Sequence, residues 1–177
     1  MEDDFMEQYL PDIYQQSIYA VDYKKLKERG IKCILFDLDN TLVPYQIKTP
    51  PERLISFIGE LKKEFKIVLF SNSPKSRLRP FKEQLEVDCL ASACKPSSYS
   101  FFKVLNEYRY NVNEVVIIGD QLITDIIGGN KVGITTILIN PVSTKDPWWT
   151  AINRSRERRI MKKLNDRDLF FKGRYYD

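Results

Sequence analysis

Carboxylate, hydroxyl, amide and amine side chains stand after short apolar runs at several places in the chain. They are Asp37, Asp39 and Thr41 after residues 31–36, Ser71 and Asn72 after 67–70, Lys95 after 87–90, and Asp120 and Asp125 after 115–118. If those runs are parallel strands, their carboxyl ends meet at one edge of a sheet, where ligands bind in such folds. The sequence therefore predicts one site built from these groups.

Four carboxylates, one lysine and a strand-end hydroxyl at a single edge favour phosphoryl transfer. Acidic groups this close together are costly unless a cation or a proton pairs with them. Mg²⁺ suits carboxylate and water oxygens, and it commonly binds through one or two carboxylates together with a substrate phosphate. The lysine and the hydroxyl then supply a cation and a donor for the phosphoryl group, whose transfer depends mainly on positioning and charge stabilisation.

The composition excludes several other kinds of catalytic centre. The chain has no histidine, which removes Ser-His-Asp and Cys-His nucleophile systems and histidine-based metal sites. Cys33, Cys89 and Cys94 are an odd number of cysteines without a CxxC spacing, so they predict neither a disulfide framework nor a zinc site. Any catalysis must use carboxylates, lysine, hydroxyls and hard metal ions.

Short runs rich in β-branched residues alternate with amphipathic segments, which is typical of an α/β fold. The runs 31–36, 67–70, 87–90, 115–118 and 134–139 predict buried parallel strands. Helical spacing appears in 101–108 and in 54–61, and the second of these follows a capping-box pattern from Thr49 to Glu52. We therefore expect a doubly wound parallel sheet with helices on both faces.

Residues 1–177 are expected to form one domain, because the sequence contains no repeat, low-complexity tract or flexible linker. Ile18, Val21 and Leu26 at helical spacing predict a helical extension over about residues 1–30 that packs on the sheet. Residues 145–177 hold 10 basic and 5 acidic side chains, against 18 and 19 in residues 1–144. The tail is therefore predicted to be a basic helical segment.

In order and spacing, the polar groups resemble the four motifs of the haloacid dehalogenase (HAD) superfamily of phosphatases. The DxDxT motif falls on Asp37, Asp39 and Thr41, the serine motif on Ser71, the lysine motif on Lys95, and the GDxxxxD motif on Gly119, Asp120 and Asp125. Receiver domains also phosphorylate an aspartate on an α/β sheet, but they carry it on a later strand and lack GDxxxxD near the end.

This resemblance implies both a mechanism and a metal. Asp37 is the expected nucleophile, which forms an aspartyl-phosphate, and Asp39 is the expected general acid and base. The implied Mg²⁺ ligands are Asp37, the backbone carbonyl of Asp39, and Asp120. Asp125 is expected to support the metal shell, Ser71, Asn72 and Lys95 to bind phosphate, and Thr41 to orient the aspartates.

The spacing of the motifs leaves no room for the cap domain that many HAD proteins carry. A helix starting near Pro50 follows Thr41 almost at once, and only a helix and a short strand fit between Ser71 and Lys95. The chain is also similar to the capless branch related to phosphatidylglycerophosphate phosphatase, in residues 11–14, 17–32, 37–43, 119–121 and the basic segment after Trp149. This narrower resemblance implies hydrolysis of phosphatidylglycerophosphate to phosphatidylglycerol.

Two alternatives to a lipid phosphatase stay open at this point. One is a soluble HAD phosphatase that acts on phosphoproteins or small phosphate esters. The other is a non-catalytic module that binds phosphate or a partner, although such a module needs no nucleophile and acid together. Taken singly, Asp37 and Asp39 suit a turn, and Asp125 suits the N-terminal cap of a short helix.

The basic tail predicts either a solvated helix face or contact with an anionic membrane. Trp148 and Trp149 favour an interface, where amphipathic rings are well accommodated. Nucleic-acid binding is disfavoured, because no recognised motif accompanies the charge. No apolar run reaches the roughly 20 residues that span a bilayer, and the acidic start lacks a signal or transit pattern. We expect a cytoplasmic protein that, if the tail binds lipid, is peripheral at the inner face of the membrane.

Overall fold

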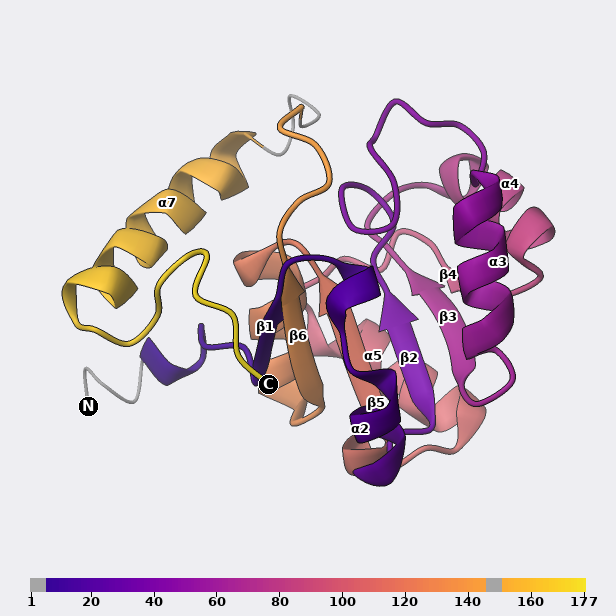
Figure 1. The fold of residues 1–177 in the computed structure, drawn as a ribbon, viewed down its shortest axis with the longest axis horizontal. Helices are drawn as coiled ribbons and strands as arrows, with labels where there is room; N and C mark the ends of the chain where they lie inside the picture. The colour runs from indigo at the N-terminus through magenta and orange to yellow at the C-terminus, as the bar shows by residue number, and fades with distance from the viewer. Residues whose placement is uncertain (1–5, 146–150) are drawn as a thin grey trace.

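The computed structural model describes residues 6–145 and 151–177, and its centre is a sheet of six parallel strands (Figure 1). The order in the sheet is β1-β6-β5-β2-β3-β4. The strands are β1 (Ile13–Gln15), β2 (Cys33–Phe36), β3 (Lys66–Phe70), β4 (Asp88–Leu90), β5 (Val115–Gly119) and β6 (Thr135–Ile139). The five strands predicted from apolar runs are confirmed, as is the α/β class.

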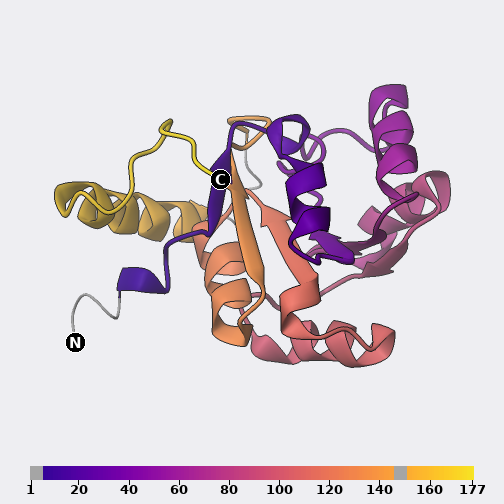
Figure 2. The same cartoon turned by 60° about the horizontal axis from the view of Figure 1, so that its bottom comes forward.

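Helices cover both faces of the sheet (Figure 2). Ile34 and Phe36 of β2 point into a core shared with α2 (Tyr23–Glu28), α3 (Glu52–Leu61) and α4 (Lys75–Leu85). Cys33 and Leu35 point to the opposite face, where α5 (Ser98–Tyr108) and α6 (Ile127–Val132) pack. This alternation is the two-residue period of a strand buried on both sides.

The capping box predicted at Thr49 is not formed. The cap residue of α3 is Pro51, which makes no side-chain hydrogen bond to the helix. Proline fixes φ near the value that the first helical turn needs, so the helix begins after the Pro50-Pro51 pair.

The N-terminal extension differs from the single helix that was predicted. It contributes β1, the turn η1 (Ile18–Ala20) and the six-residue helix α2. The cap residue of α2 is Asp22, whose side chain accepts the Lys25 N–H. β1 pairs in parallel with β6, and the Asp12 carboxylate accepts the Thr136 N–H at 2.8 Å. A three-residue edge strand depends on this distant partner, so local spacing could not reveal it.

The basic tail folds back on the β1 side of the sheet. It forms α7 (Ala151–Asp166), which lies on the same side of the molecule as β1 (Figure 1). Beyond α7, Tyr176 exchanges two backbone hydrogen bonds of 2.9 Å with Tyr14. Leu164 and Phe170 are buried in the same cluster as Tyr14. Trp148 and Trp149, singled out in the sequence, lie outside the described residues. In the described parts of the chain, no helix has the length and apolar character needed to cross a membrane.

No cap domain is inserted between the motifs, as the spacing predicted. The segment from Thr41 to Ser71 contains α3 and β3, and the segment from Ser71 to Lys95 contains α4 and β4. Two further turns complete the described structure, η2 (Val112–Glu114) and η3 (Leu122–Ile126), the second with π-helical bonding. The carboxyl edge of the sheet is therefore free of a separate covering domain.

Candidate active site

The predicted site residues meet at the carboxyl edge of the sheet. Asp37 directly follows β2, Ser71 follows β3, Lys95 follows the loop after β4, and Asp120 follows β5. All four side chains are buried. Burial of charged groups is rare unless they are paired, so the pairing of these groups determines what the site can do.

Lys95 joins the lysine motif to two of the aspartates. Its Nζ lies 2.9 Å from Asp37 Oδ1 and 2.6 Å from Asp125 Oδ1, and it also donates to the Phe70 carbonyl at 2.8 Å. Burial alone lowers the pKa of a lysine, but Asp125 and Asp37 outweigh it and raise the pKa of Lys95. The ammonium is therefore a fixed positive charge beside Asp37.

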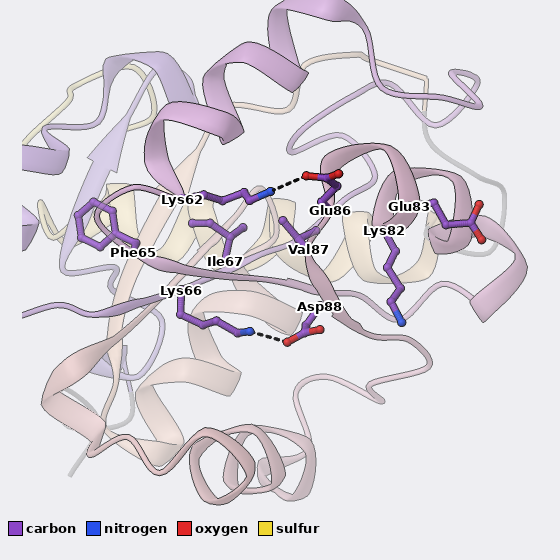
Figure 3. A pocket seen from close by; sticks show the side chains of 9 residues that line it. All are labelled: Lys62, Phe65, Lys66, Ile67, Lys82, Glu83, Glu86, Val87 and Asp88. Atoms are coloured by element: carbon purple, nitrogen blue, oxygen red, sulfur yellow. Dashed lines mark hydrogen bonds and ion pairs between the residues drawn. The ribbon is translucent and has the colours of Figure 1, made fainter.

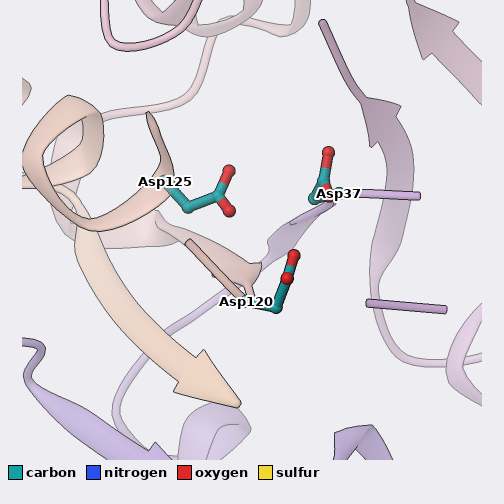
Figure 4. Close-up of side chains that lie close together, drawn as sticks. All are labelled: Asp37, Asp120 and Asp125. Atoms are coloured by element: carbon teal, nitrogen blue, oxygen red, sulfur yellow. The ribbon is translucent and has the colours of Figure 1, made fainter. Parts of the chain in front are cut away.

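Three carboxylates face one another in the same place (Figure 4). Asp37, Asp120 and Asp125 each offer an oxygen, and these oxygens lie within 4.8 Å of one another. The Thr41 hydroxyl lies 3.1 Å from Asp120 Oδ1 and 3.4 Å from Asp37 Oδ2, so it connects two of the three. This agrees with an orienting position for Thr41.

Asp125 is placed by the π-helical turn η3 rather than by the cap of a helix. The cap residue of α6 is Ile126, and Asp125 Oδ2 instead accepts the Gln121 N–H at 3.2 Å. Gly119 makes this approach possible, because a Cβ there would lie 2.1 Å from Asp125 Oδ2. Turns of this kind occur frequently at functional sites.

Burial raises the pKa of two of the clustered carboxyls. Desolvation, partly offset by Lys95, brings the pKa of Asp37 to about 6. Desolvation, partly offset by Arg154, brings the pKa of Asp120 to about 8. Both shifts have the sign expected where negative charge is crowded and lacks sufficient positive charge.

Asp39 stands apart from this cluster and has its own partners. Arg77 of α4 donates to Asp39 Oδ1 from Nε at 2.9 Å and from a terminal nitrogen at 2.7 Å, and the Ser73 hydroxyl lies 2.6 Å from Oδ2. Arg77 also donates to the Ile47 carbonyl at 2.6 Å. Ser73 and Arg77 lie outside the recognised motifs, and the start of α4 and the loop before it meet Asp39 only in three dimensions.

Asn72 has a more structural position than predicted. Its Oδ1 accepts the Lys95 N–H at 2.7 Å and its Nδ2 donates to the Lys95 carbonyl at 3.0 Å. The amide therefore joins the serine and lysine loops, and only its second Nδ2 hydrogen can still reach a phosphate. Ser71 is better placed, because its Oγ accepts the Ser73 N–H at 3.2 Å and its own hydrogen stays available to donate.

The tail also reaches the site, which the sequence did not indicate. A terminal nitrogen of Arg154 in α7 lies 2.5 Å from Asp120 Oδ2, and the other lies 3.1 Å from Glu157 Oε2. Glu157 is buried and accepts the Ile123 N–H through its other oxygen at 3.2 Å. Arg154, one of the basic residues of the tail, thus contacts the carboxylate cluster.

The donors fit a divalent metal ion of the oxygen-preferring kind. When ionised, the three clustered carboxylates carry one more charge than Lys95 and Arg154 supply, and among the residues that the structure describes no softer ligand joins the group. The metal-ligand group contains Asp125 in addition to the predicted Asp37 and Asp120, and it does not include the Asp39 side chain. Hard oxygen donors suit Mg²⁺ or a similar cation.

A pocket of about 450 Å³ lies at the amino ends of β3 and β4, away from the carboxylate cluster (Figure 3). It is lined by the first residues of β3 and the start of β4, with the ion pairs Lys66–Asp88 and Lys62–Glu86 on its wall. None of the motif residues lines it. Because ligands bind beyond the carboxyl ends of parallel strands, we assign the chemistry to the carboxylate cluster.

Comparison with known proteins agrees with this geometry. A family model described as HAD-hydrolase-like matches residues 92–166. The chain is 38% identical to a probable phosphatase, YqeG of Bacillus subtilis, over 88% of this chain and 91% of that protein. This chain therefore belongs to the HAD superfamily of phosphatases, and it is an enzyme that acts on phosphate monoesters. Members of this class generally use a divalent metal.

Two further likenesses bear on substrate and fold. The chain is 28% identical to phosphatidylglycerophosphate phosphatase 1 of Arabidopsis thaliana. The alignment covers 87% of this chain but only 47% of that protein. A HAD family enzyme of Bacteroides thetaiotaomicron, solved as a magnesium complex, has the same fold with a TM-score of 0.54 and 15% identity, covering 65% of this chain and 96% of that one.

The raised pKa values predict how the metal-free protein responds to pH. A carboxyl whose folded pKa exceeds the unfolded value of 3.8 binds more protons when folded, so stability falls as pH rises from about 4 to about 8. With no histidine in the chain, few other groups titrate between pH 5 and 8. We expect a lower Tm at pH 8 than at pH 5 in chelator, measured by calorimetry.

Millimolar Mg²⁺ should raise the Tm more at pH 8 than at pH 5, because it binds the ionised carboxylates of the folded state. Asp120→Asn is the control, since it removes the carboxyl with the higher pKa and should flatten the pH slope. A Tm that does not change with pH or Mg²⁺ would mean that the cluster is neither protonated nor metal-binding.

Proposed function

We propose that the protein is a Mg²⁺-dependent phosphatase that forms an aspartyl-phosphate on Asp37 and converts phosphatidylglycerophosphate to phosphatidylglycerol. The observation that carries the chemistry is the separation of the two aspartates of the DxDxT motif. Asp37 lies in the cluster beside the Lys95 ammonium, whereas Asp39 is held outside it by Arg77 and Ser73. Two carboxyls in such different environments suit two different roles.

In the first step, a carboxylate oxygen of Asp37 attacks phosphorus and the bond to the leaving alcohol oxygen breaks. Protonated Asp39 gives that oxygen its proton, and the alcohol departs. Lys95 stays beside Asp37 and offsets the charge of the phosphoryl oxygens, while the Ser71 hydroxyl donates to one of them. Before the transfer, Arg77 and Ser73 hold the Asp39 carboxyl in one orientation.

In the second step, a water oxygen attacks phosphorus while ionised Asp39 takes a proton from that water molecule. The bond between phosphorus and Asp37 breaks, which releases inorganic phosphate and restores the Asp37 carboxylate. Asp37, Asp120, Asp125 and the Asp39 carbonyl are the groups that would hold Mg²⁺. When bound, Mg²⁺ offsets the negative charge of the carboxylates and the phosphate.

Three features support a lipid phosphate as the substrate. The carboxyl edge has no cap domain, so a head group can approach while its acyl chains stay in a membrane. The chain is similar to a protein named phosphatidylglycerophosphate phosphatase. The outward side of α7 carries exposed Arg156, Arg159, Lys162 and Lys163, and cations near an anionic leaflet contribute about 1 kcal/mol each.

The test is hydrolysis of phosphatidylglycerophosphate in anionic vesicles, compared with p-nitrophenyl phosphate, with Mg²⁺ and with excess chelator. We expect kcat/KM to be at least roughly 10-fold higher for the lipid, as expected when the site recognises the leaving alcohol. Chelator should abolish both reactions. Equal or better hydrolysis of the small ester would favour the alternative of a soluble phosphatase for small esters or phosphoproteins.

The same vesicles test the membrane contact separately. A variant with Arg156, Arg159, Lys162 and Lys163 changed to glutamine should bind vesicles on the order of 10²- to 10³-fold more weakly. Binding of the parent should fall with added salt. Unchanged cosedimentation of the variant would reject this face as the membrane contact while leaving the phosphatase assignment intact.

A further inference from the structure

A second pocket opens directly beside the carboxylate cluster. It has a volume of about 440 Å³ and lies between the end of β6, the turn η3 and α7. Asp120 belongs both to the wall of this pocket and to the carboxylate cluster, so the pocket adjoins the proposed site of phosphoryl transfer. Leu122, Leu138 and Met161 are among the apolar side chains that line it. A group attached to the reacting phosphate can therefore extend into this space.

The charges on the wall of this pocket are unbalanced. Glu157 is its only acid besides Asp120 in the described lining, and both acids are already paired with Arg154. Two further cations, Arg158 and Lys172, also line the pocket and are exposed. Within residues 6–145 and 151–177, neither of these two cations forms an ion pair. The pocket thus offers two positive groups to an anion from outside.

Both cations are carried by segments that are anchored to the sheet. α7 is fixed next to the site by the bonds from Arg154 to Asp120 and from the Ile123 N–H to Glu157. Next to Lys172, the Gly173 N–H donates to the Tyr14 hydroxyl at 3.1 Å. The position of the two cations beside the cluster is therefore a property of the folded tail.

We propose that this pocket holds the leaving alcohol of the substrate and that Arg158 and Lys172 bind a second phosphate in it, the phosphodiester of a phospholipid head group. The proposal rests on the proposed function and names the feature of the substrate that is recognised. In phosphatidylglycerophosphate a single glycerol unit separates the monoester from the diester, so the second phosphate must lie close to the first. The apolar wall contacts the glycerol carbons, and guanidinium and ammonium groups suit phosphate oxygens.

The test uses three phosphate monoesters that resemble the proposed lipid substrate to an increasing degree. They are p-nitrophenyl phosphate with one phosphate, the deacylated head group glycerophosphoglycerol phosphate with two, and the intact lipid in detergent micelles. The variant is Arg158→Gln with Lys172→Gln. Lys103→Gln with Lys131→Gln changes the net charge equally on exposed positions of α5 and α6 and is the matched control.

For the pocket variant, the ratio of kcat/KM on the head group to kcat/KM on p-nitrophenyl phosphate should fall roughly 10- to 100-fold, mainly through KM. The intact lipid in uncharged micelles should show the same fall, and the control should keep the parent ratio. A ratio that stays at the parent value in the pocket variant overturns the inference, as does a parent that does not prefer the head group.

Binding measured without turnover separates this inference from the proposed function. In an Asp37→Asn background, calorimetry gives the Kd of the head group with and without the two pocket changes. Weaker binding in the pocket variant supports the pocket even if the lipid proves not to be hydrolysed, which would reject only the proposed function. Equal Kd values reject the pocket even if the lipid is a good substrate.

Discussion

Asp37→Asn should abolish the covalent intermediate and nearly all turnover. The amide oxygen of asparagine is neutral and a poor nucleophile, and Lys95 would then face no charge at this position. Loss of the nucleophile in another covalent hydrolase costs about 10⁶-fold in kcat, and we expect a loss of on the order of 10⁴-fold or more here. Phosphate labelling of the protein, followed by mapping of the labelled peptide, measures the intermediate directly.

Asp39→Asn is the matched comparison, because it removes the other carboxyl of the same motif. It should slow both proton transfers by roughly 10²- to 10⁴-fold, yet it leaves Asp37 beside Lys95. With a leaving group that departs without a proton, such as p-nitrophenolate, labelled Asp37 should still accumulate. If Asp37→Asn protein keeps near-parent activity, another group must be the nucleophile and the assignment of this motif is wrong.

Lys95→Met should lower both activity and stability, because the same ammonium group stabilises the phosphoryl transfer and pairs with two buried carboxylates. Loss of a preorganised stabilising group typically costs about 2.7–4 kcal/mol of activation free energy. Removing one partner of a buried pair costs about 3–5 kcal/mol of stability, and here Asp37 and Asp125 would both lose their partner. We therefore expect a kcat roughly 10²- to 10³-fold lower and a lower unfolding midpoint in urea.

Two variants separate these effects. Lys66→Met breaks the Lys66–Asp88 pair at the opposite end of β3, where both side chains are partly exposed, and should cost at most about 1 kcal/mol. Adding Asp125→Asn to Lys95→Met removes one stranded carboxylate and should recover part of the stability without restoring turnover. Recovery of turnover in that double variant would mean that Lys95 only maintains the fold.

The raised pKa values of Asp37 and Asp120 also affect the stability of the metal-free site. Without a cation, Asp37 and Asp120 can each keep a proton at mildly acidic pH, which removes the excess negative charge that burial makes costly. Binding of a divalent ion and release of protons are then two aspects of one equilibrium. We therefore expect the metal-free cluster to be most stable when protonated and least stable at high pH.

The strands that carry the motifs, and the position of those motifs at the strand ends, can be predicted from the amino-acid sequence alone. Runs such as 31–36 and 115–118 are apolar throughout, because strands covered on both faces bury every side chain. The carboxyl ends of parallel strands also lie at the edge of the sheet where ligands bind. The fold class and the carboxylate cluster followed from those two regularities, and the missing cap followed from the short spacing between the motifs.

The tertiary structure decided which additional groups complete the site. Arg77 reaches Asp39 across 38 positions of the chain and Arg154 reaches Asp120 across 34, and neither lies in a recognised motif. Likewise β1 exists only because β6 pairs with it, and the pocket exists only because the tail returns to Tyr14. Local periodicity records which face of an element is buried, whereas these contacts depend on how separate elements pack together.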